Sequence, residues 1–405
     1  MNEIQMMDEA YELVLQQLDM NRETDDEELS EIIKAVLLEM NRGKYIPLEE
    51  QIRISKDLFN AFRKLDVLQE FVEDESITEV MINGTTNIFY EKDGKILKSE
   101  KRFVSDSKLE DVIQQIVAGT NRYVNETSPI VDTRLADGSR VNVVLKPIAL
   151  NGPIVTIRKF PLEKLTMDQL IQWGSISAEI ADFLKLLVKA RYNIFVSGGT
   201  GSGKTTFLNA LSDYISGDER IITIEDSAEL QIKGVANLVR LETRNANLEG
   251  EGKVSIRDLI KSALRMRPDR IVVGEVRGEE TVDMISSAML NGHNGSMSTG
   301  HSNSAGDMLH RLETMMMMGI DLPLTAISRQ IASALDVIIH LGRIRDKSRK
   351  VLEIVEVLGY EEGKIQLQTL YKFEEEGTKD GKVFGKHVKG EALVQRDKLL
   401  AAGLS

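Results

Sequence analysis

Residues 198–207, GGTGSGKTTF, constrain this chain more than any other stretch of its sequence. They follow an apolar run at residues 192–197 and precede a helical pattern, which is the strand–loop–helix setting of a Walker A phosphate-binding loop. Glycines let the backbone wrap around phosphates so that consecutive N–H groups point inward, and the positive end of the following helix attracts the same anion. The stretch predicts that the chain binds a nucleoside triphosphate.

Two side chains of this loop carry specific chemistry. Lys204 is expected to reach the β- and γ-phosphates, and the Thr205 hydroxyl to ligate Mg²⁺, so ATP and Mg²⁺ are the expected cofactors. A glycine-rich turn that only feeds a helix is the alternative, and the flanking strand and helix patterns disfavour it. The full set of candidate binding residues in the loop is Gly198, Gly199, Thr200, Gly201, Ser202, Gly203, Lys204, Thr205 and Thr206.

Acidic residues follow two other apolar runs. Residues 221–224 end at Glu225, with Glu229 four positions beyond, and residues 271–274 end at Glu275. The carboxyl ends of parallel strands meet at one edge of a sheet, where a phosphate loop also lies. Carboxylates there can hold Mg²⁺ through water, as expected for Glu275, or activate the attacking water. Each alone reads equally well as a solvated strand end; beside a Walker A loop, the catalytic interpretation is favoured.

Histidine is scarce, with five in the chain, and two lie in the glycine-rich run of residues 292–301. His301 follows another apparent strand, so we expect it to contact the γ-phosphate side of the nucleotide. The role of His293 stays open. No spacing resembles a protein metal site.

Three arginines precede the nucleotide-binding region, namely Arg134, Arg140 and Arg158. Solvation at the surface is the default for arginine. Their place in a smaller, separate domain suggests instead that they are brought onto the phosphates when domains or subunits close. The residues alone leave the two interpretations equal.

Bulk composition excludes several classes. The net charge is −13, and residues 1–42 hold 12 acidic and 3 basic side chains, which argues against stable nucleic-acid binding. The absence of cysteine removes disulfides and thiolate sites. No apolar run approaches the roughly 20 residues that span a bilayer, and the first residues do not form a secretion signal. We therefore expect a cytoplasmic protein.

Periodicity divides the chain into parts of different pattern. Helical spacing fills the first part, which includes an expected helix at residues 48–71. Short strands and a helix follow. Apolar runs without alternation then alternate with helices, which is typical of a parallel sheet covered on both faces. The expected class is α/β. The expected parts are a helical bundle at 1–72, an α+β domain at 73–160, a linker at 161–175, the nucleotide-binding domain at 176–345, and a β-rich tail at 346–405 with a final helix at 391–402.

Four motifs in order resemble those of the secretion ATPase superfamily of type II and type IV systems. They are the Walker A loop at 198–205, an "Asp box" at 224–230, a Walker B region at 267–278, and a "His box" ending at His301. Within that superfamily the stretches LRMRPDRIVVGEVRGEE, NGHNGSMSTGHSNS and VDTRLADGSRVN most resemble the CpaF/TadA branch, which drives assembly of Flp (tight adherence) pili. The resemblance covers residues 61–375.

The resemblance implies a RecA-like P-loop ATPase core and a smaller N-terminal α+β (PAS-like) domain, assembled as a homohexamer. It places nucleotide between the two domains, with the N-terminal arginines closing on the phosphates. Carried over, Glu229 or Glu225 activates water, Glu275 is the Walker B acid, and His301 senses nucleotide. The ring would push on an inner-membrane platform protein, which would associate the motor peripherally with the cytoplasmic membrane.

The chain also departs from family patterns. Walker B reads Gly274-Glu275 where many nucleoside triphosphatases have Asp-Glu, and there is no zinc-binding tetracysteine module. Two alternatives therefore stay open beside the pilus or secretion motor. One is an ATPase of conjugation, type IV secretion or nucleic-acid translocation. The other is a nucleotide-switched hub that does not hydrolyse ATP.

Overall fold

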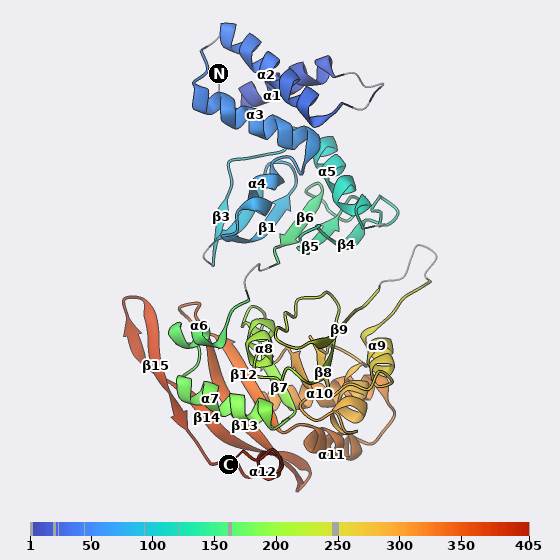
Figure 1. The fold of residues 1–405 in the computed structure, drawn as a ribbon, viewed down its shortest axis with the longest axis vertical. Helices are drawn as coiled ribbons and strands as arrows, with labels where there is room; N and C mark the ends of the chain where they lie inside the picture. The colour runs from blue at the N-terminus through green and yellow to red at the C-terminus, as the bar shows by residue number, and fades with distance from the viewer. Residues whose placement is uncertain are drawn as a thin grey trace. The chain divides into compact units, whose positions relative to one another are not determined.

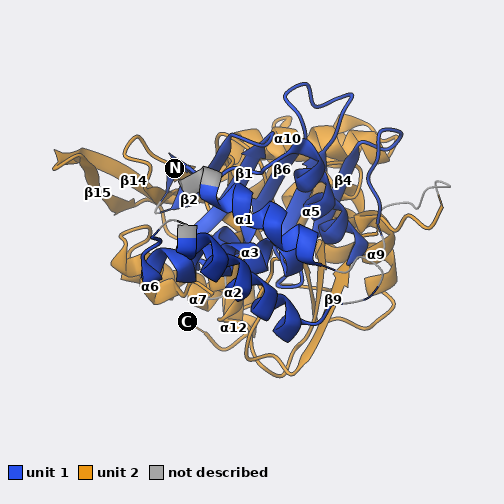
Figure 2. Ribbon diagram, turned by 90° about the horizontal axis from the view of Figure 1, so that it is seen from above, with its two compact units in different colours: residues 1–162 blue, residues 163–405 orange. Residues whose placement is uncertain are grey.

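The computed structural model of the chain describes residues 3–18, 22, 24–43, 45–92, 94–120, 122–160, 164–244 and 251–404. These residues form two compact units, residues 1–162 and residues 163–405, which are coloured separately in Figure 2. Residues 161–163, part of the expected linker, lie outside the described residues.

The first unit begins with three helices, α1 (Glu3–Gln17), α2 (Asp26–Gly43) and α3 (Leu48–Arg63), which share an apolar core. The prediction of one helix at residues 48–71 is wrong. Helix α3 ends because Lys64 is extended and Asp66 adopts a φ of 52°, in the left-handed region. A separate short helix, α4 (Leu68–Glu73), then starts and packs against the sheet below.

An antiparallel sheet follows in the order β3-β2-β1-β6-β5-β4 (Figure 1). Apolar residues on its inner face, such as Val143 and Val155, pack against α4 and against α5 (Asp106–Ala118), while the residues between them point to the opposite face. The sequence did not indicate β3 or β4. The strands are β1 (Ile77–Asn83), β2 (Ile88–Lys92), β3 (Lys95–Lys98), β4 (Ile130–Arg134), β5 (Arg140–Val144) and β6 (Ile154–Arg158).

Polar contacts join the helices to this sheet domain. Lys101, in the segment before α5, pairs with Glu70 of α4 at 2.7 Å and with Asp57 of α3 at 3.5 Å. Lys108 of α5 donates to the Ala61 carbonyl of α3 at 2.6 Å. The helical bundle and the α+β sheet therefore belong to one compact unit.

The second unit is built on a nine-stranded sheet of order β15-β14-β13-β12-β7-β11-β10-β8-β9. The run from β12 to β9 is parallel. Four of these strands were expected, and β9 and β12 were not. The parallel strands are β7 (Ile194–Gly198), β8 (Arg220–Glu225), β9 (Asn237–Glu242), β10 (Arg270–Val273), β11 (Met297–Gly300) and β12 (Val337–Arg343).

Helices cover both faces of this sheet (Figure 1). Ile194 and Val196 of β7 face one helical layer and Phe195 faces the other, which explains apolar runs without alternation. The expected linker contains α6, whose Met167 and Leu170 lie in the core. One layer holds α6 (Met167–Gln172), α7 (Ala178–Lys189) and α8 (Lys204–Ser212); the other holds α9 (Ile256–Ala263), the π-helical segment η1 (Asp283–Met289), α10 (Ala305–Gly319) and α11 (Leu324–Ala334).

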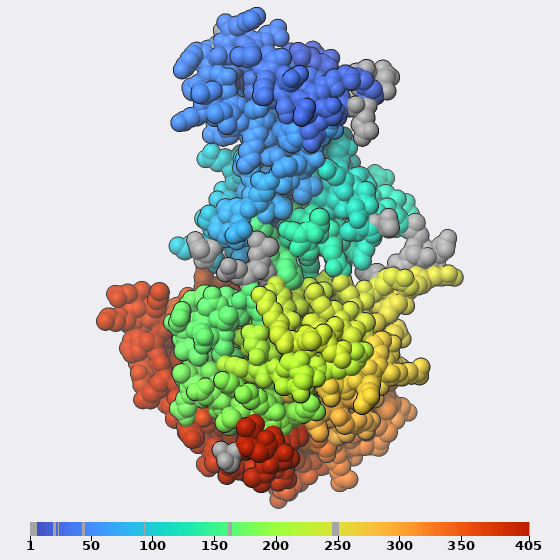
Figure 3. Space-filling model, viewed as in Figure 1, coloured from blue at the N-terminus to red at the C-terminus, as the bar shows by residue number. Residues whose placement is uncertain are grey.

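The C-terminal strands continue the nucleotide-binding sheet. Strands β13 (Arg349–Glu361), β14 (Lys364–Lys379) and β15 (Lys382–Lys389) add to β12 in antiparallel fashion. The final helix, expected at 391–402, is only α12 (Asp397–Ala401), because the N–H groups of Val394 and Gln395 bond to the Glu356 carboxylate. Figure 3 shows these dark red residues against the green surface of α7, where Leu399 joins the core.

Candidate nucleotide-binding site

The phosphate-binding loop leaves β7 at Gly198 and enters α8 at Lys204. Gly198 is enclosed: a Cβ there would lie 2.4 Å from the Leu341 carbonyl oxygen of β12 and 2.6 Å from Ser202 Oγ. Gly203, with a φ of 91°, turns the chain into the helix. Space is open at Gly199 and Gly201, where a Cβ would meet nothing within 4 Å. The loop thus has the shape of a backbone cradle at a helix N-terminus.

Lys204 is held at the base of this cradle. Its side chain is buried, and Nζ donates to the Gly199 carbonyl at 3.2 Å. Ser202 is buried beneath the loop, whereas Thr200 is exposed. Thr205 and Thr206 lie half-buried in the first turn of α8. All of the predicted loop residues therefore gather around one helix N-terminus, whose partial positive charge favours an anion.

His301 links the loop to the end of β10. Its Nδ1 lies 3.3 Å from Lys204 Nζ, and its Nε2 lies 2.9 Å from Glu275 Oε1. Because an ammonium can only donate, Nδ1 is the acceptor, which leaves Nε2 to carry the proton toward the carboxylate. Burial lowers the pKa of His301. The Glu275 carboxylate opposes this shift, and the neighbouring Lys204 cation adds to it. The imidazole is therefore neutral at neutral pH.

Glu275 is oriented from both sides. His301 contacts Oε1, and Arg277 Nη2 lies 2.9 Å from Oε2. The loop after β10 is fixed to its neighbour because Val276 N donates to the Thr299 carbonyl at 3.0 Å. Arg277 lies within the Walker B stretch, but the sequence alone indicated no role for it.

Glu225 is a buried carboxyl held by backbone donors. Its Oε1 accepts from the N–H groups of Glu229 at 3.0 Å and Leu230 at 2.9 Å. Burial raises the pKa of Glu225 to about 7, while these backbone hydrogen bonds oppose the rise. The carboxylate of the half-buried Glu229 adds to the rise in the pKa of Glu225.

The unusual glycine of Walker B follows from this carboxyl. A Cβ at Gly274 would lie 2.9 Å from Glu225 Cγ and 3.2 Å from its Oε1. Glu225 fills the space that a larger residue at position 274 would need. The Asp box and the Walker B strand are therefore matched to one another in shape.

The three predicted arginines lie in one row on the sheet of the first unit. Arg134 of β4 is opposite Arg140 of β5, which is opposite Arg158 of β6. Their strand neighbours Val141 and Ile157 are buried, so the row lies on the face away from the core. The pairing with β4, which the sequence did not indicate, is what aligns them.

A cavity of about 260 Å³ adjoins the loop within the second unit. Its apolar wall includes Leu170, Trp173 and Phe207, and its polar side includes Arg349. Arg349 Nε donates to the Gly201 carbonyl at 2.8 Å. Arg349 could not be recognised from the sequence because it is 148 residues from Gly201 and reaches the loop only through the antiparallel β13.

Oxygen donors at this site suit Mg²⁺, which prefers carboxylates, substrate phosphates and retained water. The Thr205 hydroxyl lies in the first turn of α8. Among the described residues, the buried Glu275 Oε1 has no hydrogen-bond partner beyond its contact with the neutral His301. Within the described part of the chain, no cluster of three or more His, Cys, Asp or Glu side chains could hold a metal ion.

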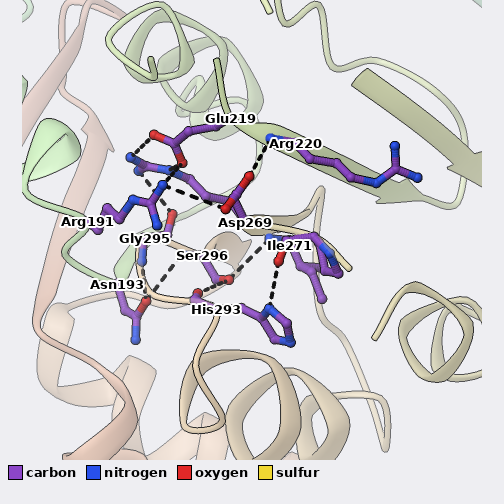
Figure 4. A network of polar contacts seen from close by, with 11 residues as sticks. Arg191, Asn193, Glu219, Arg220, Asp269, Ile271, His293, Gly295 and Ser296 are labelled. Atoms are coloured by element: carbon purple, nitrogen blue, oxygen red, sulfur yellow. Dashed lines mark hydrogen bonds and ion pairs between the residues drawn. The ribbon is translucent and has the colours of Figure 1, made fainter. Parts of the chain in front are cut away.

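The opposite edge of the sheet holds a separate polar network (Figure 4). Asn193 Oδ1 accepts from the N–H groups of Gly295 and Ser296, and Arg270 forms a bidentate pair with Glu219. His293 Nδ1 lies 3.0 Å from the Pro268 carbonyl, so this histidine lies at the amino ends of the strands, away from the loop. The network fixes β7, β8, β10 and β11 relative to one another, and their carboxyl ends carry the site.

No helix in the described ranges combines the length and the apolar character that crossing a bilayer requires.

Comparison with known proteins shows the family of the chain. Residues 62–392 match the family model described as "Type II/IV secretion system protein". A Mycobacterium tuberculosis protein named for conjugal transfer is 35% identical over 311 residues, covering 75% of this chain and 87% of its own length. The type IV secretion system protein PtlH of Bordetella pertussis is 32% identical over 316 residues, covering 72% and 93%.

Solved structures show the same fold. The pilus retraction motor PilT with bound ADP aligns with a TM-score of 0.52 at 23% identity, covering 75% of this chain and 81% of that one. The ATPase DotB of Legionella pneumophila aligns at 0.51 and 22% identity, covering 71% and 79%. The prediction of an α/β chain with a RecA-like core is confirmed.

Proposed function

Because this chain belongs to the type II/IV secretion system protein family, we propose that it is an ATP-hydrolysing motor that powers pilus assembly or protein secretion. The observation that carries the proposal is the contact series from Lys204 through His301 to Glu275. It brings the phosphate-binding lysine, a neutral histidine and the Walker B acid together at one sheet edge. A loop that only bound nucleotide would not need the acid and the histidine.

In the proposed reaction, Lys204 and the N–H groups of the loop hold the β- and γ-phosphates. Glu275 orients or deprotonates the attacking water, and His301 registers the γ-phosphate through its contact with Lys204. Both carboxylate oxygens of Glu225 accept from backbone N–H groups, so we assign Glu225 to positioning the Asp box. Glu229 is the second candidate, after Glu275, for activation of the water. Bound Mg²⁺ would neutralise phosphate charge, with Thr205 and Glu275, through water, as its protein partners.

The cavity beside the loop is the proposed site of the nucleoside. Its volume of about 260 Å³ and its apolar wall of Leu170, Trp173 and Phe207 suit a flat aromatic base. Arg349 lies between this cavity and the Gly201 carbonyl, so it would meet the junction of sugar and phosphate.

The row of Arg134, Arg140 and Arg158 is the proposed mobile half of the site. The three arginines share the sheet face away from the core, with Arg134 and Arg158 exposed and Arg140 half-buried, and such a row suits phosphate oxygens. In the proposed homohexamer this face closes on the nucleotide when the units move. The ring would act at the cytoplasmic face of the membrane by pushing on an inner-membrane platform protein.

The CpaF/TadA branch, which serves Flp pili, is the proposed subtype. Its support is the likeness of the LRMRPDRIVVGEVRGEE, NGHNGSMSTGHSNS and VDTRLADGSRVN stretches. The names of the relatives favour a second candidate, an ATPase of conjugation or another type IV secretion system. Strong stimulation of turnover by single-stranded DNA would select that candidate, whereas the net charge of −13 favours a motor without stable nucleic-acid contact.

Glu275→Gln tests the proposal directly. We expect the variant to bind ATP with wild-type affinity and to lose most of its phosphate release, because the substitution keeps the shape of the side chain and removes its charge. Lys204→Ala is the matched control that should lose binding itself. Wild-type hydrolysis by Glu275→Gln would refute the assigned chemistry, and absence of turnover in assembled wild-type rings would instead favour a nucleotide-switched hub. Native mass spectrometry with ATP tests the hexamer.

A further inference from the structure

Among the described residues, the Glu275 carboxylate contacts His301 and Arg277. Only His301 belongs to the contact series from Lys204 to Glu275 on which the proposed function rests. Glu275 Oε1 faces His301 at 2.9 Å, and Oε2 faces Arg277 Nη2 at 2.9 Å. His301 comes from the end of β11, and Arg277 comes from the loop after β10. Two side chains from different segments therefore set the plane of one carboxylate.

The backbone that carries Arg277 is fixed on both sides. Before it, Val276 is buried and donates to the Thr299 carbonyl. After it, Glu280 Oε1 accepts from Arg277 N at 2.5 Å and from Gly278 N at 2.9 Å. An ordinary surface arginine is solvated, and its ion pair contributes little. Here a carboxylate cap holds the turn that presents the guanidinium.

We propose that Arg277 is a positioning residue that holds the Glu275 carboxylate against His301 and fixes its orientation for ATP hydrolysis. The guanidinium donates to Oε2 and thereby keeps Oε1 toward His301 and the phosphate loop. This inference rests on the proposed ATPase function and adds to it a residue that acts through Glu275. Outer partners of this kind orient a metal-associated carboxylate without touching substrate.

Two single variants and one control test this role. Arg277→Ala is expected to lower kcat by about 10- to 100-fold, with the Kd for ATP at saturating Mg²⁺ unchanged. Arg277→Lys keeps the charge and should recover part of kcat. Arg345→Ala is the matched control because its side chain is also 60% exposed and also pairs with a glutamate, Glu375. It should keep wild-type kcat and Kd. Wild-type kcat in Arg277→Ala would overturn the inference.

The double variant Glu275→Gln/Arg277→Ala shows whether Arg277 acts through Glu275. It should be no slower than Glu275→Gln alone, because the carboxylate on which the arginine acts has been removed. A further loss in the double variant would overturn the inference and indicate that Arg277 contacts substrate itself.

A readout without turnover separates this inference from the proposed function. The Mg²⁺ concentration for half-maximal binding of a fluorescent ATP analogue should rise in Arg277→Ala by about tenfold or more. If the wild-type chain hydrolysed no ATP, the proposed function would fail while this midpoint still decided the role of Arg277. An unchanged Mg²⁺ midpoint would refute that role even in an active enzyme.

Discussion

Removal of one partner from the buried pair of Arg270 and Glu219 is expected to destabilise the second unit strongly. The Arg270 side chain is 0% exposed and that of Glu219 5%. The guanidinium donates from Nε to Oε2 at 2.6 Å and from Nη2 to Oε1 at 2.8 Å. A Cβ at Gly295 would lie 2.6 Å from Arg270 Nη1, so the surrounding chain has no room to rearrange around the pair.

Arg270→Met leaves a buried carboxylate with one remaining cation. Breaking a buried pair costs about 3–5 kcal/mol. Arg191 lies 3.3 Å from Glu219 Oε2, and its 44% exposed side chain retains part of the interaction, so we expect about 3 kcal/mol. Glu219→Met/Arg270→Met removes both charges, and most of the stability should return because similar apolar side chains can replace a buried pair at little cost.

Urea unfolding followed by tryptophan fluorescence measures both effects. Trp173 is the only tryptophan of the chain and lies in the second unit, so it reports the transition of that unit. The midpoint should fall strongly in Arg270→Met and recover in the double variant. A loss below about 1 kcal/mol in the single variant, or a double variant no more stable than the single one, would refute the reasoning.

Three other predictions concern the nucleotide site. The pKa of Glu225 is about 7 in the folded chain against an ordinary value of 4.5. The contribution of its buried, protonated carboxyl to the free energy of unfolding is therefore complete below about pH 4.5, and it is lost as the pH rises through about 7. The same urea assay should show this loss between pH 5 and pH 8 in wild type and a smaller one in Glu225→Gln; equal slopes would contradict the assignment. Gly274→Ala places a methyl group 2.9 Å from Glu225 Cγ and should cost about 1–3 kcal/mol of unfolding free energy, whereas an unchanged urea midpoint would show that Glu225 moves freely. Arg349→Ala removes the donor to the Gly201 carbonyl and should weaken binding of a fluorescent ATP analogue by about fivefold; Arg345→Ala is the control, and equal affinity would exclude Arg349 from the site.

Local chemistry explains what could be predicted from the sequence. The phosphate loop is encoded by glycines whose spacing is itself the signal. Glu225 and Glu275 follow apolar runs, and His301 follows an apparent strand in the glycine-rich run of residues 292–301. Because parallel strands bring such ends to one edge, their approach to Lys204 could be expected before any distance was known. The contacts of His301 with Lys204 and Glu275 fit that expectation, while the catalytic roles remain predictions.

Long-range pairing explains what the sequence did not indicate. The break after α3 depends on a left-handed residue at Asp66, and aspartate adopts that conformation too rarely to be predicted. The alignment of the three arginines needs β4, a strand of only five residues. The role of Arg349 needs β13, and the glycine at 274 needs the buried carboxyl of Glu225 from a different strand.

The addition of the C-terminal strands to the nucleotide-binding sheet has a consequence for synthesis of the chain. Gly198 pairs with Leu341, and Gly201 accepts from Arg349, 148 residues later. At roughly 5–20 residues per second, a ribosome would emit those partners about 7–30 seconds after the loop. A nascent chain therefore carries a complete Walker A sequence long before it has a complete phosphate site. A bound nucleotide could therefore stabilise this fold only after β12 and Arg349 have left the ribosome and joined the sheet.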